Sequence, residues 1–283
     1  MSAPETFSGL RVVAFESRKA DGLRKLIRRL GGEPLIAPSM REVPLEDQHE
    51  AFRFAERLFA STIDGLILLT GVGTRILVQA LSTRYPRPGI LQALSTITLI
   101  VRGPKPIVAL AELGLQPSIT VPEPNTWRDL LNTLDAQVQV KGLRIAVQEY
   151  GHSNEELLEG LAIRGAEVIR VPVYQWALPE DVGPLRQAVT AICNEQAEVL
   201  LFTSAIQVQH VLQIAKTMGV EAVFGAAAQR CVIASVGPMC TEGLTHHGFQ
   251  VDIEPVHPKM GSLLHEASLK SRAILQRKRT LDP

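Results

Sequence analysis

The chain has 283 residues, which suggests two domains if a domain takes about 100–200 residues. Hydrophobic residues make up 46% of the chain and charged residues 20%, which excludes a disordered protein and favours large cores. Lys and Arg (29) balance Asp and Glu (29), so the formal net charge is zero and nothing global favours nucleic acid or an anionic membrane as a partner.

No apolar run reaches the roughly 18 residues that a membrane span needs, and the first ten residues lack the pattern of a signal peptide. The cysteines, Cys193, Cys231 and Cys240, are few, odd in number and not in CxxC spacing. This disfavours a disulfide framework or a zinc site and suits a reducing compartment. We therefore expect a cytoplasmic protein whose cysteines are small core residues.

Short apolar runs alternate with amphipathic segments along the whole chain. The runs have the composition of parallel strands that are covered on both faces, and they span 10–15, 65–69, 97–101, 143–147, 199–202 and 231–235. Apolar residues recur with helical spacing from Leu23, Trp127 and Val208. Repeated βα units predict doubly wound α/β sheets with right-handed crossovers.

The two halves of the chain repeat one another at an offset of 133 or 134 residues. GLRVV at 9–13 matches GLRIA at 142–146, and LLT at 68–70 matches LFT at 201–203. In the same order, residues 32–38 parallel 166–172, 102–104 parallel 236–238, and 122–124 parallel 255–257. Five ordered matches at one offset indicate an internal duplication.

Proline-rich links occupy equivalent places in the two halves, at 38–44 and 172–179. We interpret them as crossings between domains, which could pair as a two-stranded connector. One α/β domain would then span 44–171, and the other would be discontinuous, with residues 1–38 plus 179–283. The alternative is two continuous domains split near residue 140, but residues 137–142 lack the composition of a linker.

Ligands of open α/β sheets bind beyond the carboxyl ends of the strands. The loops there carry Gly, Ser or Thr at helix starts, where free backbone N–H groups attract anions, although the same residues also cap helices for structural reasons. Six such loops are expected to face one cleft between the two domains. The candidate binding residues are Ser17, Arg18, Thr70, Gly71, Gly73, Arg102, Gly103, Lys105, Tyr150, Thr203, Ser204, Gly237 and Pro238.

Tyr174 lies in the second link, where its hydroxyl could donate a proton or a hydrogen bond, or where its ring could pack the hinge as expected for Trp176. GxGxxG and GxxxxGK[ST] motifs are absent, so NAD and ATP are poorly supported. The His246-His247 pair fits a helix C-terminus better than a metal site. The basic stretch 270–278 is expected to be a solvated helix end.

The ordered set of motifs resembles the uroporphyrinogen-III synthase family over about residues 8–270. In the second half the likeness rests on LFTSA at 201–205, IASVGP at 233–238, VDIEP at 251–255 and HPKMGSL at 257–263. In the first half it rests on RGPKP at 102–106 and PEPNTW at 122–127. The resemblance implies two flavodoxin-like parallel-sheet domains joined by a two-stranded connector.

It also implies a cyclising hydro-lyase of tetrapyrrole biosynthesis. Members convert hydroxymethylbilane to uroporphyrinogen III with loss of water and inversion of ring D through a spiro intermediate, without a cofactor or metal. Tyr174 matches the family's connector tyrosine, which would assist departure of the hydroxyl group, and Thr203, Ser204, Gly237 and Pro238 match residues near the substrate. The implied partners are the small-molecule substrate and, transiently, the upstream deaminase. We expect a monomer.

One departure from the family's sequence pattern supports an alternative function. Members usually carry Ser or Thr after the Gly-Pro pair, whereas this chain has Met239 and Cys240. The alternative is therefore a non-catalytic tetrapyrrole-binding or regulatory paralogue of the same fold. A third reading, a two-lobed protein that binds small anions, would call for a signal peptide.

Overall fold

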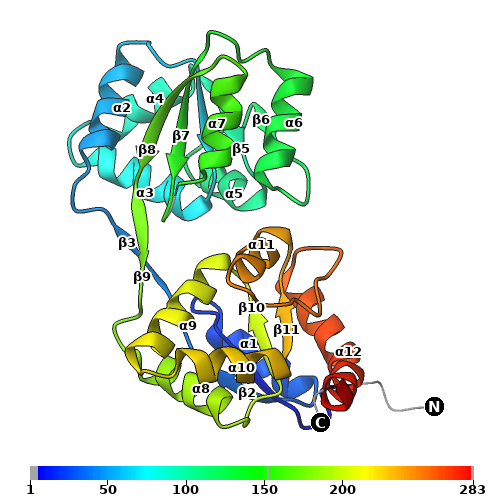
Figure 1. The fold of residues 1–283 in the computed structure, drawn as a ribbon. Coiled ribbons are helices and arrows are strands. Elements are labelled where there is room, and N and C mark those ends of the chain that lie inside the picture. Colours follow the sequence, from blue (N-terminus) through cyan, green and yellow to red (C-terminus); the bar gives the residue numbers. More distant parts are fainter. Residues whose placement is uncertain (1–5, 152, 282–283) are drawn as a thin grey trace. The chain divides into compact units, whose positions relative to one another are not determined.

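The computed structural model describes residues 6–151 and 153–281. Contacts between Cα atoms divide the chain into two compact units (Figure 1). Unit 1 combines Met1–Arg41 with Ala177–Pro283, and unit 2 is Glu42–Trp176. Each unit is an α/β body with its own parallel sheet.

Unit 2 has a five-stranded parallel sheet in the order β6-β5-β4-β7-β8. Leu66 and Leu68 point into one hydrophobic core and Ile67 and Leu69 into another, as the period of two along a strand requires. Helices therefore cover both faces of this sheet. The elements are α2 (His49–Phe59), β4 (Gly65–Leu68), α3 (Gly71–Ser82), α4 (Arg87–Leu94), β5 (Thr98–Val101), α5 (Pro104–Glu112), β6 (Ile119–Thr120), α6 (Trp127–Gln137), β7 (Arg144–Glu149), α7 (Glu155–Ile163) and β8 (Glu167–Pro172).

Unit 1 has a four-stranded parallel sheet in the order β11-β10-β1-β2, which a parallel bridge between Ala234 and Ile253 extends. Val13 and Leu200 enter one core, and Val12 and Val199 enter the core on the opposite face. The elements are β1 (Arg11–Ala14), α1 (Ala20–Arg29), β2 (Glu33–Ile36), α8 (Gly183–Cys193), β10 (Val199–Phe202), α9 (Ala205–Thr217), α10 (Glu221–Arg230), β11 (Val232–Ser235), α11 (Pro238–His246) and α12 (Met260–Leu281).

The two sheets repeat one topology. Strands β11, β10, β1 and β2 of unit 1 stand in the same order as β5, β4, β7 and β8 of unit 2. The matched stretches of the sequence fall on these pairs, since GLRVV lies on β1 and GLRIA on β7. The predicted α/β class with two parallel-sheet domains is confirmed.

Two further strands form a separate two-stranded sheet, β3 (Arg41–Pro44) with β9 (Tyr174–Ala177). Just beyond β3, the backbone N–H of Leu45 donates to the carbonyl of Val173 at 3.3 Å. Pairing in a small sheet holds the extended chain on both sides of Tyr174. The position of that residue is therefore determined by backbone hydrogen bonds and not by a free loop.

Two of the three cysteines lie in a hydrophobic core of unit 1. Cys231 and Cys240 are buried, and burial raises the pKa of each thiol to about 12. The Cys231 thiol donates to the carbonyl of Ala197 at 3.2 Å. Cys231 ends α10 and does not begin β11, so the predicted strand 231–235 starts one residue too early.

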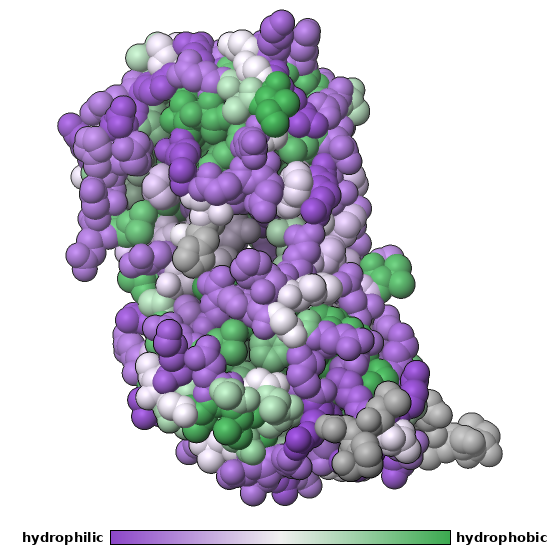
Figure 2. Space-filling view, in the orientation of Figure 1, coloured by the Kyte–Doolittle hydropathy of each residue, from purple (hydrophilic) through white to green (hydrophobic). Residues whose placement is uncertain are grey.

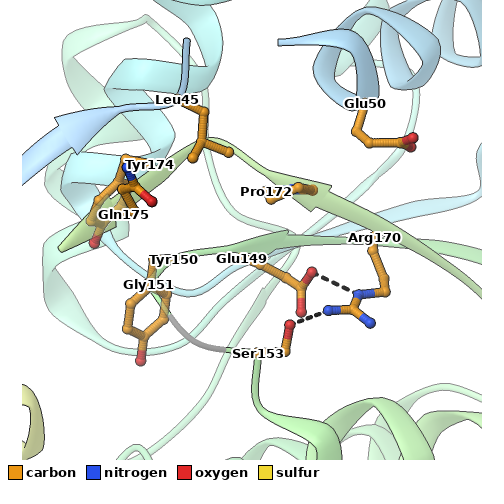
Figure 3. A pocket seen from close by; sticks show the side chains of 10 residues that line it. All are labelled: Leu45, Glu50, Glu149, Tyr150, Gly151, Ser153, Arg170, Pro172, Tyr174 and Gln175. Carbon is orange, nitrogen blue, oxygen red and sulfur yellow. Dashed lines mark hydrogen bonds and ion pairs between the residues drawn. The ribbon is translucent and has the colours of Figure 1, made fainter. Parts of the chain in front are cut away.

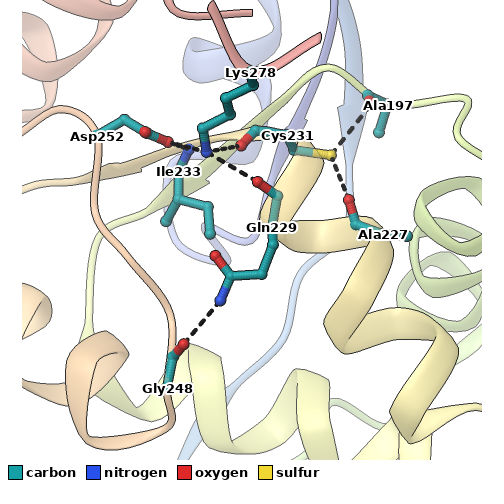
Figure 4. Close-up of polar contacts among 8 residues, drawn as sticks. All are labelled: Ala197, Ala227, Gln229, Cys231, Ile233, Gly248, Asp252 and Lys278. Carbon is teal, nitrogen blue, oxygen red and sulfur yellow. Dashed lines mark hydrogen bonds and ion pairs between the residues drawn. The ribbon is translucent and has the colours of Figure 1, made fainter. Parts of the chain in front are cut away.

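The expectation of a solvated basic helix end at 270–278 is wrong for Lys278 (Figure 4). Its ammonium group donates to the carbonyls of Gln229 (3.0 Å) and Cys231 (2.7 Å) and to the carboxylate of Asp252 (2.7 Å). Only 20% of this side chain is exposed, because its aliphatic stem extends from α12 and brings the charge to the carbonyl groups that end α10. Lys278 therefore anchors α12 to the sheet edge.

Within 6–151 and 153–281, no helix is long and apolar enough to cross a membrane. The face shown in Figure 2 is mainly hydrophilic, with separate hydrophobic patches. Large exposed apolar side chains, such as Phe59, Val108, Ile163 and Val223, come from different helices. Scattered residues of this kind are ordinary for a folded surface.

Candidate functional site

Several predicted residues of unit 2 meet at the carboxyl end of its sheet. Thr70 follows β4 and caps α3, with its hydroxyl oxygen accepting from the N–H of Gly73 at 3.0 Å. The same oxygen lies 3.2 Å from the hydroxyl of Tyr174. Tyr174 is only 3% exposed, so its hydroxyl is held in a fixed place against the start of α3. Thr70 and Tyr174, which the sequence analysis named separately, are therefore in contact.

Two glycines let the first turn of α3 approach its neighbours. A Cβ at Gly73 would lie 2.1 Å from the amide nitrogen of Gln148, and one at Gly71 would lie 2.5 Å from the carbonyl of Lys105. Gln148 is fully buried, and its side-chain oxygen accepts from the N–H of Thr70 at 3.3 Å. Both glycines thus serve close packing between α3, β7 and α5.

The loop after β5 brings a guanidinium group to the same edge of the sheet. Arg102 donates to the hydroxyl of Tyr150 at 2.6 Å, and its guanidinium carbon lies 5.5 Å from the centroid of that ring. Gly103 has a φ of +88°, which favours glycine, and Pro104 begins α5 as predicted. Because Pro104 and Pro106 carry no N–H group, this helix start has few backbone donors for an anion.

Three aromatic rings from β7 and β9 pack together at this edge. The rings of Tyr150 and Tyr174 are nearly parallel, with centroids 6.1 Å apart, and Trp176 meets Tyr150 edge-on at 5.1 Å. Gly151 has a φ of +59°, and a Cβ there would lie 2.3 Å from the Trp176 ring. The indole N–H of Trp176 is buried and finds no acceptor among the residues that the structure describes. Trp176 thus packs against Tyr150 and Gly151.

A cavity of about 470 Å³ opens beside these rings (Figure 3). Residues from the ends of β7, β8 and β9 line it, including Tyr150, Pro172 and Tyr174. Sequence reasoning missed two charged residues of its wall, Glu149 and Arg170, which form an ion pair at 2.9 Å. A signal existed, because Glu149 stands at the duplication offset of 133 from Glu16, which directly follows the equivalent strand region of unit 1.

The equivalent loops of unit 1 are joined by hydrogen bonds of their own. The Thr203 hydroxyl donates to the carboxylate of Glu16 at 2.6 Å and accepts from the buried amide of Gln207 at 2.9 Å. Ser17 accepts from the N–H of Met40 at 3.2 Å, and the N–H of Arg18 donates to Glu16 at 3.0 Å. These contacts order the predicted loops after β1 and β10.

A Gly-Pro turn follows β11. Pro238 begins α11, and the N–H of Gly237 donates to the Ser235 hydroxyl at 3.3 Å. Ser204 stands at the start of α9 without a side-chain cap bond. Cys240 is buried in the core, and the nearest following hydroxyl, that of Thr241, lies 2.5 Å from the Ser235 hydroxyl. The chain therefore offers a thioether and a buried thiol where hydroxyl groups were expected.

The predicted residues thus fall into two sets, each at the carboxyl ends of one sheet. In unit 2 only Tyr150 and Tyr174 of the predicted set line the cavity. The unit 2 set is Thr70, Gly71, Gly73, Arg102, Gly103, Lys105, Tyr150 and Tyr174. The unit 1 set is Ser17, Arg18, Thr203, Ser204, Gly237 and Pro238.

Comparison with known proteins identifies a family for this chain and solved structures that share its fold. A family model described as uroporphyrinogen-III synthase HemD matches residues 21–265. The chain is 29% identical over 262 residues to the uncharacterised protein YjjA of Bacillus subtilis (strain 168), covering 91% of this chain and 94% of that protein. A mutant uroporphyrinogen III synthase from the extremely thermophilic bacterium Thermus thermophilus shares the fold at 23% identity and a TM-score of 0.66, covering 97% of this chain and 100% of the other. A uroporphyrinogen-III synthetase from Helicobacter pylori 26695 shares it at 14% identity and a TM-score of 0.55, covering 91% and 98%.

Proposed function

This chain belongs to the uroporphyrinogen-III synthase family, and on that premise we propose that it cyclises hydroxymethylbilane to uroporphyrinogen III. The observation that carries the proposal is the contact between the hydroxyls of Tyr174 and Thr70, beside the Arg102–Tyr150 pair. A hydroxyl donor and a cation at one sheet edge fit a substrate with a departing hydroxyl group and eight carboxylates.

Tyr174 is the group that we assign to the first step. The C–O bond of the terminal hydroxymethyl group breaks, and the hydroxyl leaves as water after taking a proton that Tyr174 helps to deliver. The product is an electron-poor azafulvenium cation, which ring D attacks through its substituted carbon to give a spiro intermediate. Fragmentation and closure in the inverted sense then give the type III ring, with loss of a proton from the ring carbon.

Holding the substrate in one conformation is the larger task, because the linear chain also closes spontaneously without inversion. Arg102 provides a cation for the carboxylates. The half-buried ring of Tyr150 provides flat apolar surface for a pyrrole. Orientation and exclusion of water would therefore supply most of the rate and all of the inversion.

The test is the isomer ratio of the product. Hydroxymethylbilane would be generated in situ with the full chain present or absent, and the type III and type I products would be separated by chromatography. The proposal predicts mainly the type III isomer with the chain and the type I isomer without it. An unchanged ratio contradicts it.

The alternative, a tetrapyrrole-binding or regulatory protein without turnover, is favoured by one observation, the buried Cys240 after the Gly-Pro turn. Equilibrium binding of the stable product to the same preparation separates the two functions. Binding together with an unchanged isomer ratio would support the alternative.

A further inference from the structure

The reaction steps above leave Glu149 unused, although it is the most buried charged group in the cavity wall. Its side chain is 6% exposed, and one carboxylate oxygen, Oε2, accepts from Arg170 Nε at 2.9 Å. The other oxygen, Oε1, is buried and accepts no hydrogen bond from any residue in 6–151 or 153–281. A buried acceptor without a donor is costly, so Oε1 calls for a donor from outside the described residues.

Arg170 stands next to this acceptor and faces outward. Half of its side chain (51%) is exposed. Its Nε binds Glu149 and its Nη2 binds the Ser153 hydroxyl, with a carboxylate oxygen of Glu155 at 3.7 Å. Its Nη1 makes no hydrogen bond or ion pair with the described part of the chain. Nη1 can therefore donate to a carboxylate that approaches the outer edge of this guanidinium group.

The remaining wall suits a flat ring. Tyr150, Tyr174 and Pro172 line the cavity near the ion pair, as Figure 3 shows. Its volume of about 470 Å³ lies within the roughly 300–1,000 Å³ of small-molecule sites. Glu50 also lines it and is paired with Arg53 at 3.1 Å, so its charge does not cancel that of Arg170.

We propose that this cavity binds one pyrrole ring that carries a carboxylate arm. The ring N–H donates to Glu149 Oε1, after the Ser153 side chain turns aside, and the arm pairs with the outer edge of Arg170. The ring lies against Tyr150. This proposal rests on the proposed function, because the substrate consists of four such rings. A simple anion would use Arg170 alone and would be repelled by Glu149, so the pair selects a ligand with a donor and an anion together.

The experiment measures binding without turnover. A soluble monopyrrole with one acetate and one propionate arm would be titrated into the full chain by calorimetry, alongside its N-methyl analogue and its dimethyl ester. We expect saturable binding of the parent compound and at least tenfold weaker binding of both analogues. Equal binding of the parent and the N-methyl analogue overturns the proposal, and no binding of the parent does so as well.

Single-residue variants test which side chain makes each contact with the ligand. Glu149→Gln should weaken binding of the parent compound at least tenfold and remove most of the difference in affinity between the parent and the N-methyl analogue. Arg170→Gln should also weaken binding of the parent at least tenfold and remove most of the difference in affinity between the parent and the dimethyl ester. The matched control is Glu167→Gln, which removes a carboxylate of the neighbouring strand β8 that pairs with Arg57 at 2.6 Å outside the cavity. If the control weakens binding as much as Glu149→Gln, the assignment is wrong.

The outcomes for the two proposals can be told apart. The isomer ratio made by the wild-type chain decides the synthase function, whereas the N-methyl difference decides the cavity. Since the analogues are tested on the wild-type chain, a variant that fails to fold does not obscure the result.

Discussion

At the scale of single residues, Tyr174 has either a role in proton delivery or a role in packing, and removal of its hydroxyl oxygen distinguishes the two. It lies 3.2 Å from the Thr70 hydroxyl, within a ring cluster that would remain after loss of the oxygen. Tyr174→Phe should lower turnover to the type III product about 10²-fold, because proton delivery to the departing hydroxyl is lost. Stability should fall by only about 1 kcal/mol, the value of one hydrogen bond.

The measurement is single-turnover conversion of hydroxymethylbilane, with urea denaturation for stability. Tyr85→Phe is the control, since Tyr85 packs on Phe59 with centroids 5.0 Å apart and does not line the cavity. Turnover that is equal in wild type and Tyr174→Phe would make Tyr174 a packing residue.

The Asp64–Arg144 pair carries a pH prediction. Arg144 donates to both carboxylate oxygens of Asp64, from its backbone N–H at 2.8 Å and from its guanidinium group at 2.9 and 2.8 Å. The side-chain hydrogen bonds from Arg144 lower the pKa of Asp64 from 3.8 to about 2. Because the folded pKa lies below the unfolded one, the stabilisation is present above pH 3.8 and is lost as the pH falls toward 2.

Asp64→Asn should therefore cost about 1 kcal/mol of unfolding free energy at pH 7, after allowing for solvent screening. The difference from wild type should shrink between pH 4 and pH 2 in urea titrations. Glu159→Gln, an exposed carboxyl on α7 with no charged partner in the described chain, should show neither effect. A difference that stays constant with pH would contradict the assignment.

At the scale of elements, glycine decides how closely α3 lies on β7. Gly73→Ala would place a methyl group 2.1 Å from the buried Gln148 amide, so the helix start or Gln148 must move. We expect a loss of about 1–3 kcal/mol in stability together with lower turnover, because Thr70 and Tyr174 move with the helix start. Both are measured on the same preparation.

The matched control is Gly89→Ala in α4, where the nearest atom to the new Cβ is 3.9 Å away. Helix propensity predicts a gain of up to about 1 kcal/mol there. If Gly73→Ala behaves like Gly89→Ala, the close approach of α3 to β7 is not required.

The anchoring of α12 is a second prediction for an element. Lys278→Met removes three hydrogen bonds and leaves the Asp252 carboxylate, of which 10% is exposed, without its cation. We expect a loss of about 2–3 kcal/mol, since an unpaired buried charge is costly. Arg272→Met, the same change at an exposed site of α12, should change stability by less than about 0.5 kcal/mol. Equal losses would show that Lys278 does not anchor the helix.

At the scale of the whole molecule, each unit buries its own hydrophobic cores, and the two tryptophans, Trp127 and Trp176, both belong to unit 2. Tryptophan fluorescence therefore reports on unit 2, whereas circular dichroism reports on both units. Lys278→Met should shift the dichroism transition in urea and leave the fluorescence transition unchanged, and Gly73→Ala should shift fluorescence. Parallel shifts in both signals would indicate that the units unfold as one.

The duplication also shows how equivalent positions acquired different chemistry. Thr70 and Thr203 end equivalent strands, yet the first lies against Tyr174 and the second donates to Glu16. Glu149 stands at the position of Glu16 but pairs with Arg170. Unit 2 alone combines a connector tyrosine, a guanidinium group and a cavity in the regions described, and for that reason we place the first chemical step there.

The amino-acid sequence by itself determined six buried strands, the internal duplication, the helix starts at Gly103-Pro104 and Gly237-Pro238, and the family. These features depend on residue type and local spacing, because burial on both faces and a proline's fixed φ act within a few residues. Only the tertiary structure decided that Glu149 meets Arg170 and that Lys278 reaches the end of α10. Such partners come from distant parts of the chain, and a long charged side chain chooses among them by the packing around it, which no local pattern encodes.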